Sequence, residues 1–222
     1  MSGQRLLLLD VDGTLADCAS RIIEVLNARF GDEFRRPRRG RLLRISDITD
    51  IEMPFLRPHQ HAYLMERLGD PDFYAGLAPE PGALETLPRL RRGVDRVVVA
   101  TGRPEAARAV TEGWLGDMDV HADEVLVGRH VKSRVLSEAV RAGSTVLLVD
   151  DDPFNWMWNG PAITVRIPPH PWTVNRPGLR HLLFASWDAL AAEVAAERRP
   201  GLGARGSVDH SRRAPARGGI RL

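Results

Sequence analysis

Five short apolar runs constrain the fold of this chain more than any other feature. They are rich in leucine or valine, they do not alternate with polar residues, and they occupy residues 5–9, 96–100, 124–128, 145–149 and 162–167. Such runs are typical of strands buried on both faces, which occur in parallel sheets covered by helices. We therefore expect the core of the protein to be built on a parallel sheet.

Helical segments separate most of these runs. The pattern predicts helices over residues 81–92, 104–115, 131–143 and 186–199. Pro81 is a favourable first residue for the first of them, Gly143 ends the third, and Ser186 caps the fourth. Alternating strands and helices predict an α/β fold in which right-handed crossovers join parallel strands.

Residues 18–79 break this alternation. A helix is predicted over residues 18–30 and ended by Gly31, a basic loop follows at 35–41, and a second helix covers 58–69. No strong strand pattern occurs in the interval. It predicts a small, mostly helical insert between the first strand and the rest of the sheet.

Aspartates follow two of the apolar runs. Asp10 and Asp12 come directly after the first, and residues two apart in an extended chain point the same way, so both can face one site. Residues 150–152 are three aspartates at the end of the fourth run. Carboxylates this close repel one another unless a cation lies between them, which suggests Mg²⁺. The alternatives are an Asp-Gly turn at Asp12–Gly13 and a plain acidic loop.

Two further polar signals lie at the edge of the sheet where the strands end, and ligands of open α/β sheets bind at that edge. Thr101 and Gly102 offer a hydroxyl and an open N–H before a helix, which suits a phosphate group. Lys132 is the only lysine in a chain with 31 basic residues, and it lies in the first turn of a predicted helix. A compact ammonium can bind a phosphate oxygen and a carboxylate together, where a planar guanidinium does not fit.

Taken in their order along the chain, the four signals resemble the four motifs of the haloacid dehalogenase superfamily of phosphatases. The carrying residues are DVDGT at 10–14, Thr101, Lys132 and VDDDPFN at 149–155. The resemblance covers about residues 5–197. It implies a three-layer Rossmann-like core, residues 1–17 and 80–197, with a helical cap, residues 18–79, inserted after the first strand.

Longer stretches are similar to the 5′(3′)-deoxyribonucleotidase branch. They are DVDGTLAD, DFYAGLAPEPGALETL, GWLGDM, LLVDDDPFN and RPGLRHLLFASWDAL. That branch usually has Thr-Ser-Pro where this chain has Thr101-Gly102-Arg103-Pro104. The chain thus loses a hydroxyl and gains an arginine, a departure that bears on substrate preference.

The resemblance implies a role for each site residue. Asp10 is the nucleophile, Asp12 the general acid and base, and Lys132 the bridge between Asp10 and the phosphate. Mg²⁺ is expected between Asp10, the backbone carbonyl of Asp12 and Asp151. The remaining members are Asp150 and Asn155, expected behind the metal ligands, and Thr101 and Gly102, expected at the phosphate. Arg103, which departs from the pattern of the branch, is expected to bind the substrate.

These roles predict a Mg²⁺-dependent phosphomonoester hydrolase that forms an aspartyl-phosphate, acting on nucleoside 5′-monophosphates. Phe73 and Tyr74 are the favoured candidates to contact the base, because they match the family and lie at the cap–core boundary. A phosphatase for another small phosphate ester or for a nucleic-acid 3′-phosphate is the first alternative. A non-catalytic phosphate-binding module is the second.

Composition bears on compartment and partners. Residues 198–222 carry seven arginines and one aspartate, a net +6, so the rest of the chain carries −4 of the total of +2. This Gly-, Pro- and Arg-rich tail is expected to be disordered, and nucleic acid is not its favoured partner. Cys18 is the only cysteine, and no apolar run is long enough for a membrane helix or a signal peptide. A cytoplasmic protein without a membrane partner is expected, and a homodimer is left open.

Overall fold

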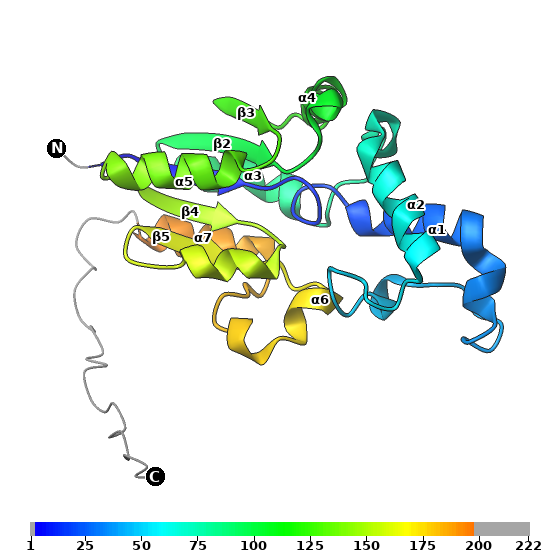
Figure 1. Ribbon diagram of the computed structural model, residues 1–222. Helices are drawn as coiled ribbons and strands as arrows, with labels where there is room; N and C mark the ends of the chain where they lie inside the picture. Colours follow the sequence, from blue (N-terminus) through cyan, green and yellow to red (C-terminus); the bar gives the residue numbers. More distant parts are fainter. Residues whose placement is uncertain (1–2, 198–222) are drawn as a thin grey trace, which may run out of the picture.

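The computed structural model describes residues 3–197, and its centre is a five-stranded parallel sheet (Figure 1). The strands are β1 (Arg5–Leu9), β2 (Arg96–Thr101), β3 (Glu124–Val127), β4 (Thr145–Val149) and β5 (Ile163–Arg166). Their order is β3-β2-β1-β4-β5, and every neighbouring pair is parallel. Each predicted apolar run therefore forms a strand, and the predicted fold class is confirmed. The expected tail, residues 198–222, lies outside the described residues.

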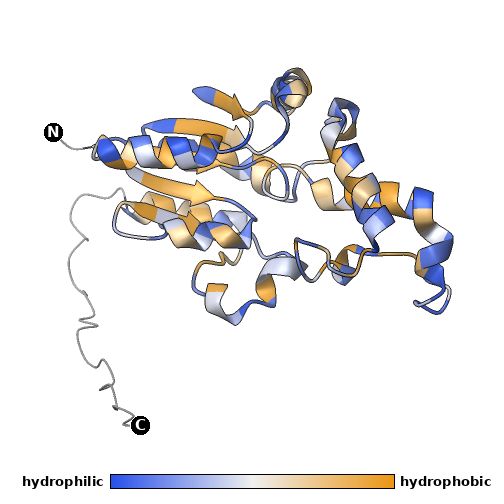
Figure 2. Cartoon of the chain, in the orientation of Figure 1, coloured by the Kyte–Doolittle hydropathy of each residue, from blue (hydrophilic) through white to orange (hydrophobic). Residues whose placement is uncertain are grey.

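Helices cover both faces of the sheet, because alternate residues of each strand point to opposite sides. Leu6 and Leu8 of β1 belong to one buried cluster with Leu136 of α5 (Val131–Arg141). Leu7 and Leu9 belong to a second cluster, together with residues of α3 (Ala83–Arg92), α4 (Arg108–Asp117) and α7 (Trp187–Glu197). Figure 1 draws α5 in front of the sheet and α7 behind it, and Figure 2 colours the strands between them as hydrophobic.

The ends of these helices follow the local signals closely. The hydroxyl of Ser186 accepts a hydrogen bond from the backbone N–H of Ala189 at 3.1 Å, so Ser186 caps α7 as predicted. The first helix after the insert starts at Ala83 instead of Pro81, because Gly82 before it adopts a left-handed conformation with φ of 79°. Short helices fill the remaining loops: η3 (Glu105–Ala107), η4 (Pro153–Trp158), α6 (Pro171–Val174) and η5 (Pro177–Leu179).

The segment between β1 and β2 that we call the cap segment, residues 18–79, contains helices and no strand, all of its residues being described. Its elements are α1 (Cys18–Arg35), η1 (Ile45–Asp47), α2 (Pro58–Gly69) and η2 (Pro71–Tyr74). Figure 1 draws α1 and α2 together beyond the end of the sheet where the strands finish. The exact boundaries of core and cap stay a prediction.

The prediction that Gly31 ends the first helix is wrong. The helix α1 continues to Arg35 and is kinked at Phe30, whose φ and ψ are −126° and 19°. Burial explains the continuation, since Phe34 lies about one turn beyond the kink and is buried in the same cluster as Phe30. The ring of Phe30 meets that of Tyr63 from α2 edge to face, with centroids 5.3 Å apart. Within the described residues, no helix has the length and apolarity needed to cross a bilayer.

Candidate active site

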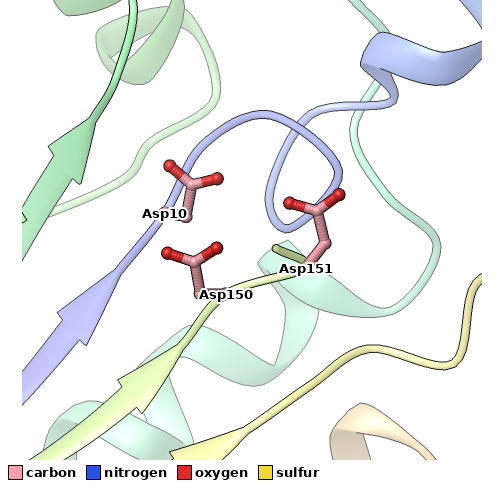
Figure 3. Close-up of side chains that lie close together, drawn as sticks. All are labelled: Asp10, Asp150 and Asp151. Carbon is pink, nitrogen blue, oxygen red and sulfur yellow. The ribbon is translucent and has the colours of Figure 1, made fainter. Parts of the chain in front are cut away.

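Three carboxylates meet where β1 and β4 end (Figure 3). Leu9 at the end of β1 is paired with Val149 at the end of β4, so the residues that follow the two strands emerge side by side. Asp10 follows β1, while Asp150 and Asp151 follow β4, and each offers an oxygen within 4.8 Å of the others. All three residues are buried.

Lys132 supplies the ammonium for this cluster. From the first turn of α5, its Nζ lies 2.9 Å from Oδ1 of Asp10 and 2.5 Å from Oδ2 of Asp150. The other oxygen of Asp150 accepts a hydrogen bond from the backbone N–H of Asp152 at 2.9 Å. Burial lowers the pKa of Lys132, but the two adjacent carboxylates raise it more, so the ammonium stays charged.

One ammonium does not balance three buried carboxylates. Burial raises the pKa of Asp10 to about 7 and that of Asp151 well above its ordinary value, while Lys132 acts in the opposite direction on both. Oδ1 of Asp10 is buried and has no aligned hydrogen bond, although the ammonium lies nearby. A divalent cation with hard-oxygen preference would relieve this repulsion, and the donor set therefore fits Mg²⁺.

The loop after β1 and the segment around α6 hold Asp151 in place. The hydroxyl of Thr14 accepts from the backbone N–H of Asp151 at 3.1 Å, and the indole N–H of Trp172 donates to Oδ2 at 3.1 Å. Gly13 has φ of 71°, and a Cβ there would lie 2.3 Å from Oδ2 of Asp151, so only glycine fits. His170 stacks on Trp172 at 4.4 Å and contacts the carbonyl of Gly13 at 2.5 Å through Nε2, which carries the proton because a carbonyl only accepts.

The end of β2 and the loop after it provide Thr101, Gly102 and Arg103. Thr101 ends β2, is buried and lines the same cavity as the acidic cluster, as Gly102 does. A Cβ at Gly102 would meet no other atom within 4 Å, so the space beside this residue is open. The hydroxyl of Thr101 accepts the backbone N–H of Arg103 at 3.3 Å and keeps its own hydrogen for another acceptor.

The side chain of Arg103 is engaged by Asp12 instead of being left for a substrate. Its Nε and Nη2 donate to the two carboxylate oxygens of Asp12 at 2.9 and 2.7 Å, and Nη1 donates to Thr111 Oγ1 at 3.1 Å. The guanidinium lies 4.3 Å from the ring centroid of Tyr74. Burial lowers the pKa of Arg103, but its bonds to Asp12 raise it overall. These contacts do not support the expected binding of substrate by the Arg103 side chain.

A cavity of about 980 Å³ joins the cluster to the cap segment. Its lining runs from Asp10, Asp12, Lys132 and Asp151 to apolar side chains of the cap segment, namely Ile48, Ile51, Met53, Leu64, Met65 and Leu68. Tyr74 lines it as expected, although Arg103 covers one face of its ring. Phe73 is 1% exposed, is packed edge to face against Tyr74 and is absent from the lining, so its placement does not support a contact with substrate.

The structure thus brings most of the expected site residues together. Asn155, expected behind the metal ligands, lies in η4 and does not line the cavity. Thr14 and Trp172 were not singled out from the sequence. Thr14 belongs to the DVDGT stretch and could have been found there, whereas no local signal marks Trp172, 21 residues from its partner Asp151.

The sequence matches one family model over residues 4–167, described as "5′ nucleotidase, deoxy (pyrimidine), cytosolic type C protein". The chain belongs to this family. The cytosolic type C 5′-nucleotidase family is a phosphatase family of the haloacid dehalogenase superfamily, and the chain is accordingly a phosphatase of the 5′-nucleotidase type. The resemblance read from the motifs is confirmed. No curated protein matches the sequence.

Solved structures similar to this nucleotidase family member are haloacid dehalogenase hydrolases. One from Deinococcus radiodurans, with bound phosphate and sodium, is 18% identical with a TM-score of 0.58, over 88% of this chain and 97% of that chain. A predicted phosphoglycolate phosphatase from Haemophilus somnus is 16% identical with a TM-score of 0.57, over 87% and 98%. A subfamily IA hydrolase from Geobacter sulfurreducens is 16% identical with a TM-score of 0.53, over 86% and 96%. At these identities the likeness concerns the fold.

Proposed function

We propose that this chain is a Mg²⁺-dependent phosphomonoester hydrolase that forms an aspartyl-phosphate on Asp10 and acts on nucleoside 5′-monophosphates. The observation that carries the proposal is the contact between Asp10 and Lys132, at 2.9 Å, inside a cavity that extends to the cap segment. A buried carboxylate next to an ammonium and a second acid, Asp12, has the composition that phosphoryl transfer through a covalent intermediate needs.

In the first step, an oxygen of Asp10 attacks phosphorus, the bond between phosphorus and the ester oxygen breaks, and Asp12 gives its proton to the leaving alkoxide. In the second step, water loses a proton to Asp12 and attacks the aspartyl-phosphate. The bond between phosphorus and Asp10 then breaks, which releases inorganic phosphate and restores both aspartates. Lys132, Thr101 and the N–H of Gly102 lie where they can hold the oxygens of the transferring group.

Asp10, Asp151 and the backbone carbonyl of Asp12 are the groups we assign to Mg²⁺. When bound, the ion supplies positive charge that neutralises the transferring phosphoryl group. Both oxygens of Asp150 already accept hydrogen bonds, from Lys132 and from the backbone of Asp152, which favours a position behind the ligands. Trp172 and Thr14 orient Asp151 as outer partners of a metal ligand.

A nucleotide substrate is favoured by two observations. The family description names a 5′ nucleotidase of the deoxy pyrimidine type. The cap side of the cavity is mostly apolar, with side chains such as Ile51, Met53 and Met65 beside the polar Glu52 and His61, and pockets for organic groups are typically lined in this way.

The test is a substrate panel with Mg²⁺, measured as kcat/KM. It compares deoxy- and ribonucleoside 5′-monophosphates of pyrimidines and purines with phosphoglycolate and p-nitrophenyl phosphate. We expect at least one nucleoside monophosphate to exceed every other ester by about tenfold, the gain that one well-placed apolar contact provides. EDTA should abolish turnover of all of them, and excess Mg²⁺ should restore it.

The panel separates the competing functions. A preference for a small non-nucleotide ester would overturn the substrate assignment and leave the phosphatase in place. Preferential release of phosphate from a 3′-phosphorylated oligonucleotide would show that the substrate is a nucleic-acid 3′-phosphate and not a mononucleotide. Binding of phosphate without turnover of any ester would make the chain a binding module.

A further inference from the structure

We propose that Arg103 is a positioning residue for Asp12, holding the general acid of the reaction in one orientation. The inference rests on the proposed phosphatase function. It starts from the arginine that distinguishes this chain at the loop after β2, for which the sequence predicts a contact with the substrate. The geometry assigns it to a carboxylate 91 residues earlier in the chain.

The pair has the geometry of a two-point clamp. Nε and Nη2 of Arg103 donate to the two different oxygens of Asp12, at 2.9 and 2.7 Å, so the carboxylate is bound in a bidentate manner. A single contact would leave the carboxylate free to rotate, whereas two contacts fix its torsion. Lysine cannot reproduce this fork.

The clamp itself is held rigidly. The side chain of Arg103 has no exposed area, its Nη1 donates to the hydroxyl of Thr111, and that hydroxyl donates to the carbonyl of Ala107 one helical turn before it. The ring of Tyr74 covers the guanidinium at 4.3 Å. Apart from Asp12, the groups that contact the guanidinium are Thr111 of α4 and Tyr74 at the end of the cap segment.

Tyr74 connects this arrangement to the cap segment. Its hydroxyl donates to the carbonyl of Leu68 at the end of α2, at 2.8 Å, while its ring lies against Arg103. The orientation of Asp12 therefore depends on side chains from both sides of the cavity. Asp12 keeps access to the cavity, since its side chain is 25% exposed and lines it.

The clamp is compatible with proton transfer. A carboxylate has about four acceptor positions on its two oxygens, so two bonds to Arg103 leave a position on each oxygen for the proton that goes to the leaving group. Orientation matters here because a displacement of about 1 Å can cost about 10²-fold in rate. Loss of the clamp should therefore slow the reaction most for substrates whose leaving group needs a proton as it departs.

The experiment compares two esters of similar size, benzyl phosphate and p-nitrophenyl phosphate. The alkoxide of the first needs a proton on leaving, whereas p-nitrophenolate leaves readily without one. The ratio kcat/KM is used because it reports the steps up to departure of the leaving group. We expect Arg103→Met to lower it by about 10²-fold for benzyl phosphate and by about tenfold or less for p-nitrophenyl phosphate.

A double-mutant cycle with Asp12→Asn tests whether Arg103 acts through Asp12. Arg103→Met in the Asp12→Asn background should cost no more than about threefold further, because residues that act as a unit are not additive. Arg103→Lys should recover part of the loss, and it also serves if the methionine variant does not fold. Arg108→Met is the matched control, since it removes a half-buried arginine that pairs with Glu105 in the same region and does not contact Asp12.

Equal losses on the two esters, or losses that add in the double variant, would overturn the inference. Additive losses would instead make Arg103 a phosphate contact, and equal losses that follow a lowered melting temperature would make it a packing residue. Asp10→Asn, measured in parallel, separates this result from the proposed function. If Asp10→Asn keeps full activity, the phosphatase mechanism fails whatever the Arg103 variants do.

Discussion

Lys132→Arg is the change that most directly tests the geometry of the acidic cluster. The charge is kept, but the compact ammonium becomes a longer, planar fork. The ammonium now contacts one oxygen of Asp10 at 2.9 Å and one of Asp150 at 2.5 Å, and its side chain is largely buried between them. A guanidinium cannot occupy that point without moving one carboxylate or leaving the pair altogether.

The expected loss follows from the displacement. Because Asp10 must approach phosphorus in line, a shift of about 1 Å in its carboxylate should lower turnover by about 10²-fold. That factor corresponds to about 2.7 kcal/mol of transition-state stabilisation. Lys132→Ala should lower turnover at least as much, because it removes the ammonium altogether. It should also lower the stability of the fold, since removal of one partner from a buried ion pair typically costs about 3–5 kcal/mol.

The assay is kcat/KM for Lys132→Arg on a good and a poor phosphate ester, with thermal melting as the folding control. Both substrates should lose equally, because the contact is to the nucleophile and the transferring group and not to the remainder of the substrate. The matched control is Arg134→Lys, an exposed position on the same helix, which should behave as wild type. Wild-type kinetics in Lys132→Arg would refute the bridging role.

Three further changes test other parts of the site. Asp10→Asn should leave less than about 1% of the activity and an unchanged melting temperature, because the amide is nearly isosteric but cannot attack phosphorus. A higher residual rate in a pure preparation would exclude Asp10 as the nucleophile. Trp172→Phe removes the indole N–H that bonds to Asp151 and should lower the affinity for Mg²⁺ by about tenfold or more. The affinity is measured from the Mg²⁺ dependence of turnover and from the rise of melting temperature on adding Mg²⁺. An unchanged Mg²⁺ affinity would contradict the orienting role. Burial raises the pKa of Glu80 from 4.5 to about 7, so the folded chain loses stability as pH rises through that interval. Glu80→Gln should therefore stabilise the fold at pH 8 by at most about 3 kcal/mol and leave its stability unchanged at pH 4.5. A gain in denaturant stability that is equal at both pH values would show that ionisation of Glu80 is not the cause.

The sequence by itself determined the strands of the sheet and the order of the polar residues that follow them along the chain. Uniform apolar runs identify strands buried on both faces because the burial requirement acts on each strand separately and is visible within about five residues. Asp10, Thr101, Lys132 and Asp151 could be predicted as site residues for a related reason. Each follows a strand or begins the next helix, and the carboxyl ends of parallel strands share one edge of the sheet.

Only the tertiary structure decided how the side chains at that edge are paired. Arg103 was expected to bind the substrate, and its side chain bonds to Asp12. Phe73 was expected to contact the base, and it lies in the core. The direction of a side chain in a loop depends on partners from other elements, such as Thr111 and Tyr74, that carry no signal in the local sequence. Trp172 could reach Asp151 only once β5 and α6 had brought it back across the sheet edge, because a hydrogen bond depends on distance in space and periodicity reports only distance along the chain.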